Sequence, residues 1–256
     1  MPTVLILSSH VAASRVGGAA QAAVLNRAGI ETILIPTVVL GRQPGAGSPG
    51  GGPLSPDMFA SVIEGVVASG ALDRVNAVIA GYFAEPSQVR AAVSLIAAVR
   101  AASPEAWIVV DPIMGDDGKG LYVSEGVAEV LTAELIPLAE LVTPNAWELA
   151  RITGRPIKGP RAALAAARDV GGAILASSIA EGEDIGVLYA DASQAYLAFH
   201  ARLDADPKGA GDLLTAWFVS SILRGLSPRE ALFAAVEQAA SMVCGQTISP
   251  RMISIS

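Results

Sequence analysis

The strongest chemical signal in this chain is at residues 206–212, which read Asp-Pro-Lys-Gly-Ala-Gly-Asp and lead into an apolar run without a breaker before Gly225. Glycines let backbone N–H groups turn towards a ligand, and the start of the following helix adds free N–H groups and partial positive charge. The stretch therefore predicts an anion site, for a phosphate or for an oxyanion that develops during a reaction. A carboxylate at such a site, here Asp212, is suited to act as a general base that takes a proton from an attacking hydroxyl. The alternative is an ordinary loop, with Asp212 in the first helical turn because the helix dipole favours it.

Two more carboxylates follow apolar runs. Asp111 ends a buried run and precedes the rigid Pro112, which suits a carboxylate that holds Mg²⁺ directly or through water. Its alternative role is to cap a turn. Asn145 and Glu148 lie three residues apart at a helix start, so both can point towards one volume and Glu148 could share the metal. The alternative is that Asn145 and Glu148 only cap the N-terminus of the helix.

Missing motifs exclude several other chemistries. The two histidines, His10 and His200, form no zinc pattern with the single cysteine, and the chain has neither a nucleophile elbow nor a P-loop. Residues 45–50 match Gly-x-Gly-x-x-Gly, but Pro49 prevents the helix that a dinucleotide pyrophosphate needs. Ser9 or His10, after the first apolar run, could hydrogen-bond a substrate, and a structural histidine is the alternative.

Hydrophobic periodicity predicts the elements that position these residues. Short apolar runs predict strands at residues 3–8, 31–35, 76–80, 107–110, 141–143 and 173–176. Helical patterns cover residues 16–28, 55–67, 86–102, 124–135, 160–170 and 228–244, with further helices after residues 144 and 209. Residues 186–189 and 195–199 predict a hairpin that turns near Asp191. The alternation indicates an α/β fold with a mostly parallel sheet and an antiparallel edge hairpin, so ligands are expected at the loops that follow the strands.

Two segments lack a clear pattern. Residues 41–56 are rich in glycine and proline and long for a loop, which indicates a functional flap or a disordered segment. The tail at residues 246–256 shows little periodicity. Because no repeat or linker divides the chain, we expect residues 1–256 to form a single domain.

Composition limits the partners and the compartment. The 256 residues include 17 Lys or Arg and 24 Asp or Glu, a net charge of −7 without a basic cluster, so nucleic acid and acidic membranes are poor partners. Hydrophobic residues make up 52% of the chain, yet no stretch reaches the roughly 18 apolar residues of a membrane span. The N-terminus lacks a basic signal-peptide region, and Cys244 alone cannot form an internal disulfide. A cytoplasmic protein is expected.

The motifs at the ends of the expected strands resemble, in the same order, those of pyridoxal kinases, the vitamin B6 branch of the ribokinase-like superfamily. The Gly-Ala-Gly-Asp run marks the superfamily, and Ser-His-Val with Asp-Pro-Ile-Met-Gly points to the pyridoxal branch. The matching residues are Ser8, Ser9, His10, Val11, Pro36, Thr37, Val38, Gly81, Tyr82, 111–115, Lys119, Gly120, Thr143, Pro144, Asn145, Glu148 and 209–212. The resemblance covers nearly the whole chain up to the last helix. It implies a three-layer α/β/α fold and ATP-dependent phosphorylation of the 5′-hydroxymethyl group of pyridoxal, pyridoxine or pyridoxamine.

The resemblance also implies a role for individual residues. Asp212 would activate the hydroxyl as a base, and Gly209, Ala210 and Gly211 would form the anion hole for the γ-phosphoryl group. Asp111 and Glu148 would lie around Mg²⁺. The nucleotide would be bound by Asp111, Thr143, Glu148, Ser177, Pro207, Lys208, Gly209 and Gly211. The substrate would be bound by Ser9, Val16, Thr37, Tyr82 and Asp212. The family further implies a homodimer and leaves room for a monovalent cation.

The chain departs from the family pattern in three regions, the first of which is residues 12–14, Ala-Ala-Ser, where the family often has Tyr after Val11. The flap begins Leu-Gly-Arg-Gln-Pro at residues 40–44, where the family has a polar segment that contains aromatic residues. Ser177 stands where the family often carries a Lys or Thr near the phosphates, and Lys208 could supply that charge. These differences leave two alternatives open. One is a kinase of hydroxymethylpyrimidine or another small ring alcohol, and the other is a nucleotide- or pyridoxal-binding protein without turnover.

Overall fold

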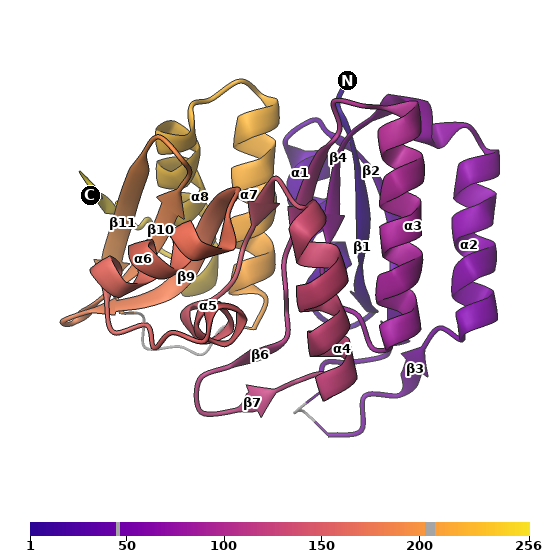
Figure 1. The fold of residues 1–256 in the computed structure, drawn as a ribbon, viewed down its shortest axis with the longest axis horizontal. Helices are drawn as coiled ribbons and strands as arrows, with labels where there is room; N and C mark the ends of the chain where they lie inside the picture. The colour runs from indigo at the N-terminus through magenta and orange to yellow at the C-terminus, as the bar shows by residue number, and fades with distance from the viewer. Residues whose placement is uncertain (45–46, 203–207) are drawn as a thin grey trace. The chain divides into compact units, whose positions relative to one another are not determined.

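The computed structural model describes residues 1–44, 47–202 and 208–256 (Figure 1). These residues form two compact units, each of which has a sheet with helices on its faces. Unit 1 comprises Met1–Met114 and Leu121–Ala139, and unit 2 comprises Gly115–Gly120 and Glu140–Ser256.

The sheet of unit 1 is parallel apart from one edge strand. Its strands stand in the order β5-β4-β1-β2-β3, and β3 runs antiparallel to β2. In β1, the side chains of Val4, Leu5, Ile6 and Leu7 are all fully buried, as expected of a parallel strand covered on both faces. The strands expected in this part of the chain are therefore confirmed, with β1 and β2 longer than expected. Their bounds are β1 Thr3–Val11, β2 Glu31–Leu40, β3 Gly51–Pro53, β4 Val75–Ala80 and β5 Trp107–Val110.

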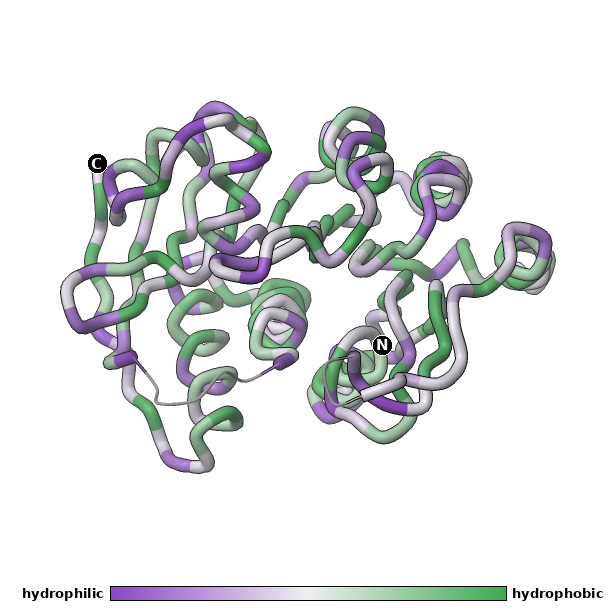
Figure 2. Tube along the Cα trace, turned by 90° about the horizontal axis from the view of Figure 1, so that it is seen from below, coloured by the Kyte–Doolittle hydropathy of each residue, from purple (hydrophilic) through white to green (hydrophobic). Residues whose placement is uncertain are grey.

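Helices cover both faces of this sheet. Helix α1 packs on one face, and α2, α3 and α4 lie on the other, with α3 beside both of its neighbours (Figure 1, Figure 2). Ser55 caps α2 by accepting the Met58 amide. The helix expected at residues 124–135 ends in a π-helical turn and a 3-10 turn that contains Pro137, which has no N–H to continue the α-helical pattern. The bounds are α1 Gly17–Arg27, α2 Pro56–Ala68, η1 Ala71–Arg74, α3 Pro86–Ala102, α4 Glu125–Val130, η2 Leu131–Leu135 and η3 Ile136–Leu138.

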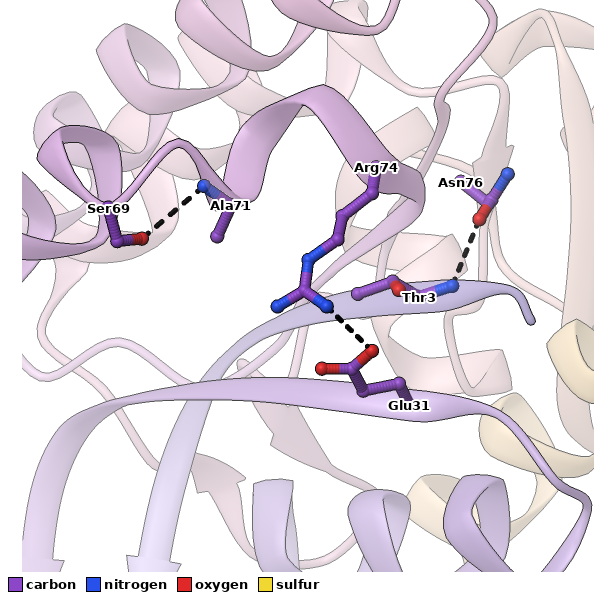
Figure 3. A network of polar contacts seen from close by, with 6 residues as sticks. All are labelled: Thr3, Glu31, Ser69, Ala71, Arg74 and Asn76. Carbon is purple, nitrogen blue, oxygen red and sulfur yellow. Dashed lines mark hydrogen bonds and ion pairs between the residues drawn. The ribbon is translucent and has the colours of Figure 1, made fainter.

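A β-bulge sets the register of β4 against β1. Thr3 pairs with Val75 and Val4 pairs with Ala77, so Asn76 is the extra residue between them. The Asn76 side chain uses this position to accept the Thr3 amide at 2.9 Å (Figure 3). The ion pair between Arg74 and Glu31 in the same view is exposed, so it contributes about 0–1 kcal/mol at most.

The flap at residues 41–56 is more ordered than its composition indicates. Strand β2 continues to Leu40, and β3 returns beside it. Beyond this ladder the Gly41 amide donates to the Gly50 carbonyl at 3.2 Å and the Arg42 amide to the Pro49 carbonyl at 3.0 Å. The expectation of a loop without strands is therefore wrong at 51–53, because glycine and proline carry no strand signal even where the backbone pairs.

The sheet of unit 2 is mainly antiparallel. Its order is β12-β11-β10-β9-β8, and only the β8–β9 pair among these strands is parallel. The expected hairpin is confirmed as β10 and β11, and Asp191 accepts the Ser193 and Gln194 amides at its turn. Burial would raise the pKa of Asp191, but hydrogen bonds from Ser193, Tyr189 and Gln194 outweigh burial and lower it. The bounds are β8 Leu141–Val142, β9 Ala173–Glu181, β10 Asp184–Ala190, β11 Ala195–Ala201 and β12 Arg251–Ser254, and the short β6 Gly115–Asp116 and β7 Gly120–Leu121 precede them.

The patternless tail was expected to form no element, and that expectation is wrong. Strand β12 pairs antiparallel with β11, with Met252 opposite Ala198. Three of its four residues belong to an exposed edge, so no buried face leaves an alternating pattern in the sequence.

Helices again cover both faces of the unit 2 sheet. Helices α5 and α6 lie on one face, and α7 and α8 lie on the other (Figure 1). The rings of Phe218 on α7 and Tyr189 on β10 stack with centroids 5.6 Å apart. Across the described residues, no helix has the length and apolar character to span a membrane. The bounds are α5 Ala146–Thr153, α6 Pro160–Val170, α7 Ala210–Leu223 and α8 Pro228–Cys244.

Gln21 on α1 has an unusual environment in the interior of unit 1. Its side chain is 0% exposed, and neither the amide nitrogen nor the amide oxygen has a hydrogen-bond partner in the described part of the chain. A buried polar group left unpaired costs about 1–3 kcal/mol. Gln21 should therefore lower the stability of unit 1.

Replacing Gln21 with Met, which has a similar shape, should raise the free energy of unfolding by about 1–3 kcal/mol because the unpaired amide is removed. Urea unfolding followed by tryptophan fluorescence measures this change. The control is Gln88→Met, which removes another buried amide, but one with three hydrogen bonds, and should lower stability. A loss of stability in Gln21→Met would show that this amide has a partner, such as a buried water.

Candidate functional site

The candidate residues divide between the two units. Unit 1 holds Ser9, Val16, Thr37, Tyr82 and Asp111. Unit 2 holds Thr143, Glu148, Ser177, Lys208, Gly209, Ala210, Gly211 and Asp212. Pro207 lies outside the described residues. Within each unit, hydrogen bonds draw several candidates together.

The glycine loop opens α7 as the sequence predicts. Gly209 is the N-cap residue with φ 85° and ψ 3°, a left-handed conformation that favours glycine. Among the described residues, which omit 203–207, no side chain caps this end of the helix, so the N–H groups of the first turn are open to a ligand from this part of the chain. A β-carbon on Gly211 would meet no atom within 4 Å. Gly211 is therefore not required by close packing among the described residues.

Asp212 is the third residue of α7, and its side chain is only 9% exposed. The Leu213 amide donates to the Gly209 carbonyl at 3.0 Å, which closes the first turn and fixes the backbone of Asp212. The helix dipole favours a carboxylate at this position, which agrees with the alternative that Asp212 stabilises the first turn of the helix. The same geometry also places a buried carboxylate in the first turn of α7, a position that suits a general base for phosphoryl transfer.

A buried pair of hydroxyls joins α7 to the segment after β8. The Thr215 hydroxyl donates to the Thr143 hydroxyl at 3.0 Å, and the two side chains are 1% and 7% exposed. Thr215 lies three residues after Asp212, on the same side of the helix. Because the Thr143 oxygen accepts from Thr215, its own proton is directed away from Thr215 and can be given to a ligand. Sequence reasoning missed Thr215, although its helical spacing from Asp212 was the available signal.

Asn145 and Glu148 form the capping box considered above. The Asn145 side chain accepts the Glu148 amide at 2.9 Å, and the Glu148 carboxylate accepts the Asn145 amide at 2.9 Å. Both side chains also hold Gly115: Glu148 accepts its amide at 3.3 Å, and the Asn145 amide donates to its carbonyl at 2.8 Å. Glu148 is 3% exposed. It is a structural carboxylate, and its buried charge is also suited to a cation nearby.

Gly115 admits no other residue in this arrangement. A β-carbon there would lie 2.6 Å from the Trp147 ring and would also run into the Gly120 carbonyl. The glycine of the Asp-Pro-Ile-Met-Gly motif is therefore needed for close packing against α5. Its place beside Glu148 explains why the two motifs occur together in one chain.

Ser177 lies at a bulge inside β9 and not in a loop after a strand, which corrects the expectation that the strand ends at Ala176. Gly186 pairs with Ile179 but Leu188 pairs with Ala176, so β9 holds an extra residue here. Ser178 has φ 62°, a left-handed conformation that is uncommon outside glycine. The Ser177 amide donates to the Pro144 carbonyl at 2.9 Å. The bulge thus brings Ser177 next to the segment that carries Thr143. Beyond the bulge, β9 continues to Glu181 and stays paired with β10.

In unit 1, Asp111 follows β5 as expected and is 5% exposed. Its amide donates to the Ala80 carbonyl at 2.8 Å. Two residues later Ile113 has φ 41°, which is a genuine outlier for a β-branched residue. Strain of this kind persists only where surrounding structure enforces it, and it is concentrated at functional sites.

Ser9 and Val16 meet at the N-terminus of α1. Val16 is the half-buried N-cap residue, and no side chain caps this helix either. A β-carbon on Gly17 would run into Ser9, and Gly17 has φ 65°, so glycine is required there on both counts. Ser9 therefore lies in close contact with the first residue of α1.

Thr37 and Tyr82 are linked by hydrogen bonds at the ends of three strands. The fully buried Thr37 hydroxyl donates to the Tyr82 carbonyl at 2.7 Å. The Tyr82 amide donates to the Ser8 hydroxyl at 3.3 Å. Burial and then the nearby charge of Glu85 raise the pKa of the Tyr82 phenol, so the ring stays neutral. Sequence reasoning assigned no such contact to Ser8 or Gln88, because their partners Tyr82 and Thr37 lie far away along the chain.

Asp111 in unit 1 and Glu148 in unit 2 are each a type of side chain that can bind magnesium. Each carboxylate is at least nine-tenths buried. Across the described residues, no three His, Cys, Asp or Glu side chains gather as a metal-binding group. Mg²⁺ needs no such group, because it usually keeps waters and takes one or two carboxylates together with substrate phosphates. Lys208 is exposed, as a side chain that reaches a ligand from the loop would be.

Comparisons with known proteins agree with these motifs. The family model described as phosphomethylpyrimidine kinase matches residues 48–249. The pyridoxine/pyridoxal/pyridoxamine kinase of Bordetella avium is 35% identical over 237 residues, which covers 90% of this chain and 80% of that protein. Pyridoxal kinase from Entamoeba histolytica has a TM-score of 0.92 at 24% identity, with all of both chains covered. The Leishmania donovani pyridoxal kinase solved with ADP and pyridoxamine has a TM-score of 0.90 at 22% identity, again over the whole of both chains. The strands, helices and motifs of this chain therefore make it a member of the pyridoxal kinase family, an α/β family of kinases within the ribokinase-like superfamily.

Proposed function

We propose that this chain transfers the γ-phosphoryl group of ATP to the 5′-hydroxymethyl group of pyridoxal, pyridoxine or pyridoxamine. One observation carries the proposal: left-handed Gly209 opens an uncapped α7, and the carboxylate of Asp212 is buried in its first turn. Binding of the transferred group and removal of the hydroxyl proton are the two tasks of such a kinase. The similarity to the kinase of Bordetella avium supports the choice of substrate.

In this proposal the anion loop binds the group in transfer. The N–H groups of Gly209, Ala210 and Gly211 hold the γ-phosphoryl oxygens, and Thr143 donates its hydroxyl proton to a phosphate oxygen. Asp212 takes the proton from the hydroxymethyl oxygen as that oxygen forms its bond to phosphorus, and ADP leaves. Ser177 and Lys208 bind the nucleotide, and the charge of Lys208 takes the place of the phosphate-side lysine or threonine of the family.

Asp111 and Glu148 would hold Mg²⁺ through water or directly. When bound, the ion would neutralise charge on the phosphates. The burial of both carboxylates supports this assignment, because a buried carboxylate gains from a nearby cation. A monovalent cation is an additional component of the proposal, to be tested by exchanging the salt of the assay.

The ring alcohol is assigned to the residues of unit 1. Ser9 hydrogen-bonds the pyridine ring, and Val16 and Tyr82 form the apolar wall. Thr37 supports that wall, because its hydroxyl is engaged by the Tyr82 carbonyl. We also propose that residues 1–256 act as one kinase domain, that the enzyme is a homodimer, and that it works in the cytoplasm. Analytical ultracentrifugation tests the dimer.

A pyrimidine alcohol, such as hydroxymethylpyrimidine, is the second candidate substrate. The matching family model is described by a pyrimidine substrate, and the flap at residues 41–56 differs from the pyridoxal pattern. Incubation with Mg-ATP and each alcohol, followed by detection of ADP and of the phosphorylated product, separates the two. Phosphorylation of the pyrimidine alone would overturn the vitamin B6 proposal, and phosphorylation of neither would overturn both.

Replacing Asp212 with Asn should abolish turnover, because the amide keeps the size of the side chain but cannot accept the proton. A loss of at least about 10²-fold in kcat is expected of a general base. ATP affinity, measured by calorimetry, should stay within an order of magnitude of the wild type. If ATP binding is lost as well, Asp212 is a structural residue of the helix start.

Replacing Thr215 with Val should reduce kcat/KM for ATP by about fivefold, because it removes one hydrogen bond that orients Thr143. Ser220→Ala is the matched control. Ser220 is a fully buried hydroxyl on the same helix, but it donates locally to the Trp217 carbonyl at 2.9 Å. Steady-state kinetics should show no change in the control, and equal effects in both variants would argue against a role for the Thr215–Thr143 pair.

A further inference from the structure

Gln88 on α3 is a buried amide with an unusual set of partners. It is the third residue of the helix and 1% exposed. Its side-chain oxygen accepts the Ala84 amide at 3.0 Å. Its side-chain nitrogen donates to the Thr37 carbonyl at 2.8 Å and to the Leu54 carbonyl at 3.3 Å. All the hydrogen-bonding groups of this amide are therefore directed at backbone.

The three partners belong to three different segments of unit 1. Ala84 lies two residues after Tyr82, in the connection from β4 to α3. Thr37 is in β2, the strand that leads into the flap, and Leu54 directly follows β3, the strand that returns from it. One side chain thus ties both ends of the flap to the segment that carries Tyr82.

Thr37 extends the same network. Its carbonyl accepts both Gln88 and the Leu54 amide, the latter at 3.0 Å. Its hydroxyl donates to the Tyr82 carbonyl, and the Tyr82 amide in turn donates to Ser8. The segment around Tyr82 is therefore held from the ends of β1 and β2 and from α3.

Gln21 shows that helix packing alone does not demand such bonds. It is also a buried helical glutamine of unit 1, and its amide has no partner. The three bonds of Gln88 thus reflect its place between segments, not a general need of buried glutamine in this unit.

We propose that Gln88 is a positioning residue for the ring alcohol: it fixes the wall at Tyr82 relative to the two ends of the flap. The inference rests on the proposed function, which assigns Tyr82 to the substrate wall. Without Gln88 the wall would be less well placed before binding, so binding of the alcohol would have to order it. The anion loop belongs to unit 2, and none of its residues takes part in this network.

The test compares Gln88→Met with Gln21→Met. Both variants replace a buried glutamine with a side chain of similar shape, but only the first breaks hydrogen bonds. Gln88→Met should raise KM for the ring alcohol about tenfold and leave KM for ATP within about twofold. Gln21→Met should change neither constant. Equal rises in both KM values, or the same effect in Gln21→Met, would overturn the proposal.

A second variant, Gln88→Glu, keeps the acceptor for Ala84 but loses the donor to Thr37 and Leu54. Burial raises the pKa of a carboxyl group, and its protonated form can donate one bond. KM for the alcohol should therefore fall back towards the wild-type value between about pH 8 and pH 6, relative to the wild type at each pH. A relative KM that does not change with pH would contradict the role of the donor.

Amide hydrogen exchange separates this inference from the proposed function. In Gln88→Met the amides of Ala84 and Leu54 should exchange faster than in Gln21→Met, whatever the substrate is. If the wild type phosphorylates no ring alcohol, the proposed function fails and the assignment of Gln88 to its substrate fails with it. If the wild type is active but exchange at Ala84 and Leu54 is unchanged in Gln88→Met, the positioning role alone fails.

Discussion

A buried polar group needs a hydrogen-bond partner, and this requirement organises the segments that follow the strands in both units. In unit 1, Ser8, Thr37 and Gln88 engage the backbone around Tyr82. In unit 2, Thr215 engages Thr143, and the capping box of α5 holds the short strand β6. These bonds occur where the backbone leaves a strand or enters a helix, so its groups have no regular partner. The candidate chemistry therefore depends on a polar framework at the ends of apolar strands.

Strain marks the same places. Among the described residues, the non-glycine residues with positive φ are Ile113 and Ser178. Ile113 lies two residues after Asp111, and Ser178 lies next to Ser177. Left-handed backbone costs about 1–3 kcal/mol for such residues, which the surrounding packing must offset. Both outliers thus lie within two residues of a candidate site residue, one of them named from its chemistry and the other from the family resemblance.

Local signals explain which parts of the fold could be predicted. Helices α3, α6 and α8 have the expected bounds because each begins with proline at its first position. Strand β12 could not be predicted, because its partner β11 lies about 50 residues earlier and its own residues are exposed. The candidate site shows the same division. The loop at Gly209 has a local signature, whereas the partners of Gln88 are up to 51 residues away in sequence and leave no pattern to read.

The missing cap on α7 has a thermodynamic consequence. Helices α2, α4, α5 and α8 each begin with a side chain that accepts one of their first N–H groups, whereas α7 begins at a glycine that has no side chain to offer. A phosphate bound there would act as the cap, so the last step in forming the helix end would coincide with binding. Occupancy and local order at residues 209–212 would then report one equilibrium, and inorganic phosphate alone would stabilise the protein by an amount that grows with the logarithm of its concentration relative to its dissociation constant.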